Sequence, residues 1–360
     1  MPVLLQDILD QGFRSVSIIG LGKNTGKTFS FNHLLQEARQ LGIQVAMTTI
    51  GLDGEEQDSL FYHDKPKIVI YPGDIVANAS SLLIESGLDY EVLGSTDIMT
   101  PLGEVILARV LSRGRTLLSG PSTARELALV KSQLETVGID LFLVDGAIDR
   151  RSLAAPMVTD TTILAVGAEV SLDIQYLLDK VRQELAVLNL PEWDRGEFAS
   201  LLRDQALGDD VKLVVFSKQG LEGQLTQQEF FGDPQCLTQV VKADTETVFI
   251  RGILTDEVLD KVLGCQSVKT SFSLLVTDPA CVFLSRQGFQ RLETNGLELE
   301  VLHPIHLSAV TVNPFHRRAG LVDPLRLLNE VGQAAHPLPV YDLNLGLRFT
   351  PAKEAFHGTS

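Results

Sequence analysis

A glycine-rich segment near the start of the chain carries the residue types that bind nucleotide phosphates. Residues 17–28 read SIIGLGKNTGKT, a short apolar run followed by a loop that ends in Lys-Thr. Glycines allow backbone N–H groups to close around phosphate oxygens, while Lys27 can reach the β- and γ-phosphates and the Thr28 hydroxyl can ligate Mg²⁺. The segment is a variant of G-x-x-x-x-G-K-[ST], because Leu21 stands where that pattern has its first glycine. The residues expected to contact the nucleotide are Gly22, Lys23, Asn24, Thr25, Gly26, Lys27 and Thr28.

The apolar residues after this loop have helical spacing, which places Phe29, Leu34 and Leu35 on one face of a predicted helix. A glycine turn that merely joins a strand to a helix is the alternative interpretation. That alternative does not explain why Lys-Thr follows the last glycine. We therefore expect a phosphate loop between a buried strand and a helix.

Asp145 is the second residue with a predicted chemical role. It follows the apolar run Leu141–Val144, so it lies at the carboxyl end of a predicted buried strand. A carboxylate at this place holds Mg²⁺, directly or through water, in enzymes that have a phosphate loop. A strand-ending aspartate that only caps the next helix is the alternative. The expected metal ligands are Thr28 and Asp145.

An acidic stretch, GLDGEEQD, follows the predicted strand Ile43–Ile50. Asp53 is the candidate for holding Mg²⁺ through water or for orienting an attacking water, and Asp58 stands behind it. An acidic turn without chemistry is the alternative. The stretch YPGDIVANAS, residues 71–80, has the character of a loop that closes over a ligand, although Pro-Gly-Asp is also common in turns.

Composition excludes several classes of protein. The chain has 360 residues and is 44% hydrophobic, which is ample for globular cores. A net charge of -16 argues against a nucleic-acid or anionic-membrane surface, although a local basic patch can exist in an acidic protein. The 3 cysteines have no metal or disulfide spacing, and no apolar run has the length of a membrane span. We expect a cytoplasmic protein with no nucleic-acid or membrane partner.

Strand-like and helical segments alternate along the chain, which predicts an α/β fold with a mostly parallel sheet. Pro191 and the polar residues after it interrupt this pattern, so we expect a nucleotide-binding domain at residues 1–194 and a smaller α/β domain at 195–360 for a client or partner. The strands expected in the second half are Lys212–Phe216, Thr247–Ile250, Ser273–Val276, Leu297–Val301, Ala309–Val312 and Val340–Leu343. The helices expected there are Thr255–Leu263, Cys281–Leu292 and Asp323–Ala334.

Two resemblances extend these interpretations. The segment GLGKNTGKT resembles the phosphate loops of the molybdopterin-guanine-dinucleotide biosynthesis adaptor and of dethiobiotin synthetase, which belong to the dimerising branch of P-loop proteins. KNTGKT, TTIGLDGEEQD, KPKIVIYPGDIV, LLSGPS, VDGAIDRRS and AVTVNPF…LPVYDL together resemble the P-loop subunit of the reactivating factor for lysine 5,6-aminomutase, an enzyme that uses adenosylcobalamin and pyridoxal phosphate. This resemblance implies a P-loop NTPase that acts beside a MutS-like ATPase subunit and restores an aminomutase whose cobalamin is damaged. It carries residues 22–28 and Asp145 over as nucleotide-site residues, and the first resemblance implies a possible homodimer.

Three functions remain open from the sequence. Nucleotide hydrolysis can drive a conformational cycle on a client, or the chain can be a small-molecule kinase or ATP-dependent ligase, or a nucleotide-binding adaptor without turnover. The N-K-x-D motif that selects guanine is missing, which favours ATP over GTP with Mg²⁺. TVNP at Thr311–Pro314 is a candidate for a base-reading or partner-contact loop. His303 and His306 are expected to be ordinary loop residues, since Pro304 between them disrupts a helical metal pair.

Overall fold

The structure is a computed structural model that describes residues 4–50, 68–147, 157–193, 202, 208, 210–232, 234–264 and 272–349. The acidic stretch with Asp53 and Asp58 lies outside the described residues, so their predicted roles stay predictions.

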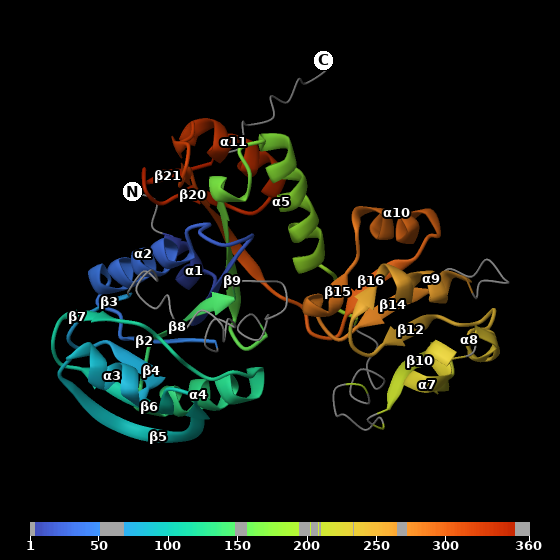
Figure 1. The fold of residues 1–360 in the computed structure, drawn as a ribbon, viewed down its shortest axis with the longest axis horizontal. Coiled ribbons are helices and arrows are strands. Elements are labelled where there is room, and N and C mark those ends of the chain that lie inside the picture. Colours follow the sequence, from blue (N-terminus) through green and yellow to red (C-terminus); the bar gives the residue numbers. More distant parts are fainter. Residues whose placement is uncertain are drawn as a thin grey trace, which may run out of the picture. The chain divides into compact units, whose positions relative to one another are not determined.

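Within the described part of the chain, ten strands form one large sheet (Figure 1). Six neighbouring strands from β20 to β2 run parallel, as does β4 beside β2, while the strands at both outer edges are antiparallel. In sheet order the strands are β21 (Leu347–Arg348), β20 (Val340–Asp342), β17 (Leu307–Asn313), β9 (Thr161–Gly167), β1 (Ser15–Gly20), β8 (Leu141–Ala147), β2 (Val45–Thr49), β4 (Ile75–Ala79), β6 (Gly103–Val110) and β5 (Tyr90–Thr100).

Helices cover both faces of this sheet, as the alternating side chains of β8 show. Leu141 and Leu143 belong to the core formed with helices α1 and α2, whereas Phe142 and Val144 belong to the core formed with α4. Successive side chains of a strand point to opposite faces, so a strand that is apolar at every position is covered on both. The helices of this part of the chain are α1 (Leu4–Asp10), α2 (Lys27–Gln40), α3 (Ser80–Ser86), α4 (Ala124–Val137), α5 (Ile174–Leu188) and α11 (Pro324–Ala335), and a small antiparallel pair joins β3 (Ile68–Ile70) to β7 (Gly114–Thr116).

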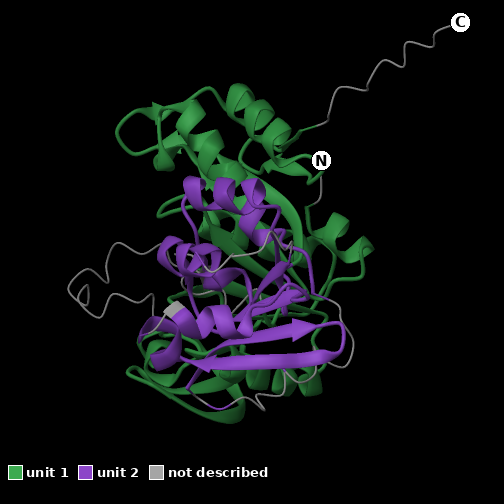
Figure 2. Cartoon of the chain, turned by 90° about the vertical axis from the view of Figure 1, so that its right-hand side faces the viewer, with its two compact units in different colours: residues 1–185, 306–360 green, residues 186–305 purple. Residues whose placement is uncertain are grey.

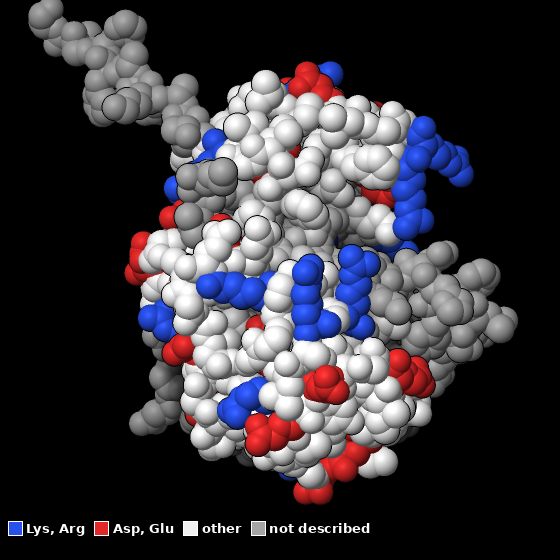
Figure 3. All heavy atoms as spheres, turned by 90° about the vertical axis from the view of Figure 1, so that its left-hand side faces the viewer, with Lys and Arg blue, Asp and Glu red and all other residues white. Residues whose placement is uncertain are grey.

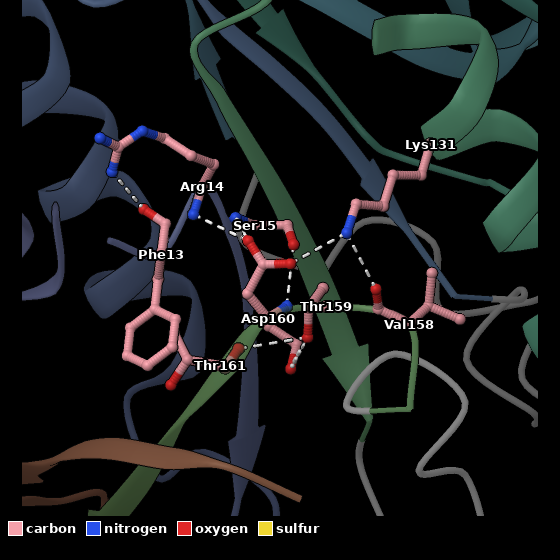
Figure 4. Close-up of polar contacts among 9 residues, drawn as sticks. Phe13, Arg14, Ser15, Lys131, Val158, Thr159, Asp160 and Thr161 are labelled. Atoms are coloured by element: carbon pink, nitrogen blue, oxygen red, sulfur yellow. Dashed lines mark hydrogen bonds and ion pairs between the residues drawn. The ribbon is translucent and has the colours of Figure 1, made fainter. Parts of the chain in front are cut away.

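At the edge where β1 and β9 begin, one carboxylate holds several segments together. Asp160 Oδ2 accepts hydrogen bonds from the backbone N–H groups of Arg14 and Ser15, both at 2.8 Å, and Oδ1 lies 3.0 Å from Lys131 Nζ of α4 (Figure 4). Lys131 also donates to the Val158 carbonyl at 3.2 Å. Burial raises the pKa of Asp160, but these hydrogen bonds and the lysine charge outweigh burial and hold the pKa below its ordinary value. We call this the amino edge of the sheet.

The chain divides into two compact units, coloured separately in Figure 2. Unit 1 consists of Met1–Leu185 and His306–Ser360, and unit 2 of Ala186–Ile305. This division differs from the expected domains 1–194 and 195–360 in two places: residues 186–194 belong to unit 2, and residues 306–360 belong to unit 1. The larger difference is the return of residues 306–360. The reason is that β17 pairs with β9 and β20 pairs with β17, so the last part of the chain returns to the first sheet.

Unit 2 has a sheet of its own, with β12, β14 and β16 parallel and β10 and β11 antiparallel. Its helical and strand segments alternate as the sequence predicts, so the expected fold class, α/β with a mostly parallel sheet and a second smaller α/β part, is confirmed. The bounds are β10 (Val211–Ser217), β11 (Gly220–Thr226), α7 (Gln227–Gly232), α8 (Pro234–Val240), β12 (Thr247–Ile250), β13 (Leu254–Thr255), α9 (Asp256–Gly264), β14 (Ser273–Val276), β15 (Val282–Phe283), α10 (Arg286–Thr294) and β16 (Glu298–Val301).

Basic side chains gather on one face of the molecule although the net charge is -16 (Figure 3). The Arg39 guanidinium lies 3.7 Å from the centre of the Tyr71 ring, and that of Arg113 lies 4.9 Å from it. Arg39 is also paired with Asp74 at 2.9 Å. Arg39 and Arg113 thus share one aromatic ring, and the expected lack of a nucleic-acid partner stays a prediction.

Of the two interpretations of residues 71–80, the turn is confirmed and the loop over a ligand is wrong. Pro72-Gly73 forms the turn, and Ile75–Ala79 forms the buried strand β4 inside the large sheet. In unit 2, the helix expected from Cys281 begins at Arg286, because Ser285 caps it by accepting from the Gly288 N–H and the short strand β15 precedes it.

Candidate functional site

The glycine-rich loop lies at the edge where the parallel strands end, which we call the carboxyl edge. Strand β1 stands between β9 and β8, and the loop continues from it into α2. The Leu21 N–H donates to the Ala165 carbonyl of β9 at 3.0 Å, which ties the start of the loop to the neighbouring strand. Ligands of open parallel sheets bind at this edge, outside the carboxyl ends of the strands.

Glycine is required at two positions of this site. Gly26 has φ 102°, in the left-handed region that other residues adopt at a cost. At the end of β9, a Cβ on Gly167 would lie 2.7 Å from the Thr25 Cα, so the loop packs directly on the strand backbone. The loop is closed further by the Thr25 hydroxyl and the Lys27 ammonium, which donate to the Gly22 carbonyl at 3.1 and 3.2 Å.

The N-terminus of α2 has features of an anion-binding site. Helix α2 begins at Lys27, and its N-cap is Gly26, which has no side chain. The first N–H groups of a helix carry the partial positive charge of the helix dipole. The Lys27 side chain lies over the same loop. Backbone donors, dipole and ammonium together favour a phosphate group, so the residues present fit a bound nucleotide.

Asp145 lies on the strand next to the loop strand. In the sheet register it stands opposite Ile18 of β1 and Thr49 of β2. Its carbonyl accepts from the Thr49 hydroxyl at 2.9 Å and from the Ile50 N–H at 3.1 Å, which fixes the backbone at the end of β8. The structure thus brings the loop and Asp145 to adjacent strands at one edge, and the metal-binding role of Thr28 and Asp145 stays a proposal.

A cavity of about 310 Å³ adjoins the loop within unit 1. One wall comes from the loop and α2, the other from the end of β17 and from residues 343–344 after β20. The Ser30 and Thr311 hydroxyls are hydrogen-bonded at 2.9 Å across the buried end of the cavity. The lining residues are Thr25, Gly26, Phe29, Ser30, Thr311, Val312, Asn313, Pro314, Phe315, Leu321, Leu343 and Asn344.

Phe29 differs from its sequence-based expectation. Leu34 and Leu35 are buried in the core, but Phe29 is 50% exposed and lines the cavity, while Phe31 is the phenylalanine of α2 that is buried. An exposed aromatic ring beside a phosphate loop offers a flat apolar surface to a ligand. The TVNP motif, residues 311–314, lines this cavity and was singled out in the sequence. Asn344 also lines the cavity, but no sequence pattern marks it, because its position depends on how β20 pairs.

The described part of the chain holds no cluster of side chains typical of a metal site. There, no group of three or more His, Cys, Asp or Glu side chains could hold a metal ion. Likewise, none of the described helices is long and apolar enough to cross a membrane. The His306 ring packs 4.8 Å from the ring of Phe13, as expected for a structural loop residue.

Cys281 of unit 2 has a half-buried thiol that is poorly suited to act as a nucleophile. Burial, followed by the charge of Asp278, raises the pKa of Cys281 to about 11. Burial also raises the pKa of Asp278, and it lowers that of Lys212, which donates to the Arg251 carbonyl at 2.7 Å. Because the reactive form of cysteine is the thiolate, Cys281 is inert at neutral pH.

Comparison with known proteins finds partial matches among solved structures. No protein-family model and no curated protein matches the chain. Two solved structures similar to it are the BceF tyrosine kinase domain (15% identity, TM-score 0.25) and the kinase domain of Escherichia coli tyrosine kinase ETK (18% identity, TM-score 0.25). Each comparison covers 50% of this chain, and 68% and 64% of those domains. A TM-score of 0.25 is too low to transfer the activity of those domains.

The mostly parallel sheet thus places the glycine-rich loop between β1 and α2 next to β8, the strand that carries Asp145.

Proposed function

We propose that the chain binds a Mg²⁺-nucleotide at the carboxyl edge of the large sheet. The observation that carries this proposal is the glycine loop at the N-terminus of α2, with the Lys27 ammonium over it, on the strand next to β8, which carries Asp145. Residues 22–28 hold the phosphates, with Lys27 compensating their charge. Thr28 and Asp145 hold Mg²⁺, which neutralises negative charge on the phosphates when it is bound.

The cavity next to the loop is the place for the base. Phe29 offers its exposed ring, and Asn313 and Asn344 offer amide groups that both donate and accept hydrogen bonds. A cavity of about 310 Å³ is at the small end of the range for ligand sites, which suits one heterocycle and not a whole nucleotide. The phosphates therefore lie on the loop outside the cavity, and ATP is favoured over GTP because N-K-x-D is missing.

Phe29→Ala tests the placement of the base. The variant should bind Mg²⁺-ATP about tenfold more weakly, since stacking of a base on an aromatic ring contributes ~1–3 kcal/mol. Binding of Mg²⁺-tripolyphosphate, which has no base, should be unchanged. Calorimetry with both ligands measures the difference, and an equal loss for both would remove the base from this cavity.

The finer proposal is that nucleotide turnover serves a reactivating factor for an adenosylcobalamin-dependent lysine 5,6-aminomutase, with a MutS-like ATPase as partner subunit. The support is the resemblance of the motifs, which extends from KNTGKT to LPVYDL over most of the chain. Hydrolysis converts the nucleoside triphosphate and water to the diphosphate, inorganic phosphate and a proton. Loss of the terminal phosphate changes the contacts of the loop, and a partner can use that change.

The test is a reactivation assay. An aminomutase is inactivated by turnover and then mixed with this protein, the partner ATPase, Mg²⁺-ATP and fresh cofactor. Recovery of aminomutase activity that requires Lys27 is the expected result, with slow basal hydrolysis that rises when partner or client is added. No recovery, together with stoichiometric phosphorylation of a small metabolite, would instead establish a kinase or ligase of the dethiobiotin synthetase type. Tight nucleotide binding without turnover under any condition would establish an adaptor.

A further inference from the structure

A short hairpin formed about 290 residues later in the sequence places an arginine on the phosphate loop. Strands β18 (Phe315–His316) and β19 (Gly320–Leu321) are antiparallel, and the turn between them carries Arg317 and Arg318. The Arg317 guanidinium donates from Nη2 to Asn24 Oδ1 at 2.8 Å. Asn24 lies in the middle of the loop and has φ 59°, in the left-handed region.

The hairpin is held in this place by contacts of its own. The Arg317 N–H donates to Glu169 Oε2 at 2.9 Å, and Glu169 follows directly after β9, the strand on which the loop packs. His316 Nδ1 accepts from the N–H groups of Arg318 and Ala319 at 3.1 and 3.0 Å, which fixes the turn. The base of the hairpin is closed by the Val322 N–H, which donates to the Pro314 carbonyl at 2.9 Å.

The two arginines of the turn differ in their surroundings. Both are exposed. Arg317 donates through its side chain to Asn24 of the loop, whereas Arg318 contributes its backbone N–H to the turn. A guanidinium has five N–H donors in a fixed plane, and one bond to an amide oxygen leaves donors that match phosphate oxygens. The chain has a net charge of -16, which repels a phosphate group, and a cation fixed beside the loop offsets this repulsion locally.

We propose that Arg317 contacts the terminal phosphates of the bound nucleotide, supplied from within the same chain by the β18–β19 hairpin. This inference rests on the proposed nucleotide site and assigns it a further binding residue. The same hairpin lines the cavity through Phe315 and Leu321. It therefore contacts both the cavity proposed for the base and, through Arg317, the loop proposed for the phosphates. Nucleotide binding therefore holds the hairpin down on the loop.

Paired variants test the role of Arg317. Arg317→Ala should bind Mg²⁺-ATP about tenfold more weakly, because it loses charge-assisted hydrogen bonds to phosphate. Arg318→Ala removes the same charge from the same exposed turn and should bind as the wild type does, while Arg317→Lys should recover part of the loss. Calorimetry gives the affinities, and circular dichroism confirms that each variant is folded.

The outcomes separate this inference from the proposed function. If the wild-type chain binds neither Mg²⁺-ATP nor Mg²⁺-GTP, the nucleotide site itself is refuted, and the role of Arg317 with it. If the wild type binds and both alanine variants bind equally well, or are weakened equally, Arg317 has no specific role and only the inference fails.

Limited trypsin digestion gives a second readout on the unaltered chain. Trypsin cleaves after Arg317 and Arg318 at the exposed turn, and mass spectrometry identifies those cuts. Saturating Mg²⁺-ATP should slow both cuts at least severalfold in the wild type, and should not slow them in Lys27→Ala. Cleavage at an unchanged rate in a chain that demonstrably binds Mg²⁺-ATP would overturn the proposal that the hairpin closes on the nucleotide.

Discussion

The two edges of the large sheet differ in how their polar groups are satisfied. At the amino edge, the Asp160 carboxylate accepts from two backbone N–H groups and pairs with Lys131 (Figure 4). At the carboxyl edge, α2 begins after a glycine N-cap, and a cavity opens beside it. A carboxylate that is paired within the fold stabilises it, whereas a helix N-terminus beside a cavity can bind an anion. The comparison favours a structural role for the amino edge and supports the proposed ligand site at the carboxyl edge.

The largest expected effect tests the functional edge. Lys27→Ala should weaken Mg²⁺-nucleotide binding at least about 100-fold, or ~2.7 kcal/mol, since the ammonium compensates phosphate charge inside the loop. Thermal unfolding should be nearly unchanged. Lys131→Met is the matched control, because it removes a lysine from the opposite edge and should leave nucleotide affinity unaltered. Loss of affinity in both variants, measured by calorimetry, would mean that the two edges do not differ in the way described.

A stability measurement tests the structural edge. Asp160→Ala should lower the free energy of unfolding by roughly 1–3 kcal/mol, because it leaves two backbone N–H groups without their acceptor. Urea denaturation measures this loss, and nucleotide affinity should not change. Lys131→Met should cost less, about 0.5 kcal/mol, since a partly exposed ion pair contributes little. A stable Asp160→Ala variant with impaired nucleotide binding would reverse the comparison.

Asp145→Asn tests whether the Asp145 carboxylate binds Mg²⁺ at the carboxyl edge. The substitution keeps the shape of the side chain and removes the charge that attracts Mg²⁺. Affinity for ATP should fall about tenfold in the presence of Mg²⁺, the size of change that follows loss of a partner at a metal site, and should be unaffected in EDTA. Equal losses in both conditions would assign Asp145 a structural role at the end of β8.

The smallest expected effect is the pH dependence that Asp160 confers. Its pKa is lowered by folding, so the folded state binds fewer protons here than the unfolded state does. Its contribution to stability is therefore complete above the unfolded pKa of about 4 and is lost as the pH falls through the lower folded value. Unfolding curves between pH 7 and pH 3 should show this decline, and Asp160→Asn should remove it. An identical decline in that variant would assign it to other carboxylates.

The contact of the β18–β19 hairpin with the phosphate loop could not be predicted from the sequence. No periodicity marks residues 315–321, and Arg317 stands 293 positions from Asn24, the residue it contacts. Strand β4 shows the same limit on a smaller scale. Pro72 and Gly73 indicate a turn, but they do not indicate the buried strand that follows it. The C-terminal strands were predicted as strands, but their membership of unit 1 depends on the pairing of β17 with β9.

The sequence by itself determined the α/β class, the loop at residues 17–28, Asp145 at a strand end and most strand and helix segments, because each of these depends on local composition and spacing. Only the tertiary structure decided that residues 306–360 complete the large sheet, that Phe29 faces a cavity and that Arg317 reaches Asn24. The physical reason is that strand propensity is local, whereas the choice of a pairing partner depends on packing between segments far apart in the chain.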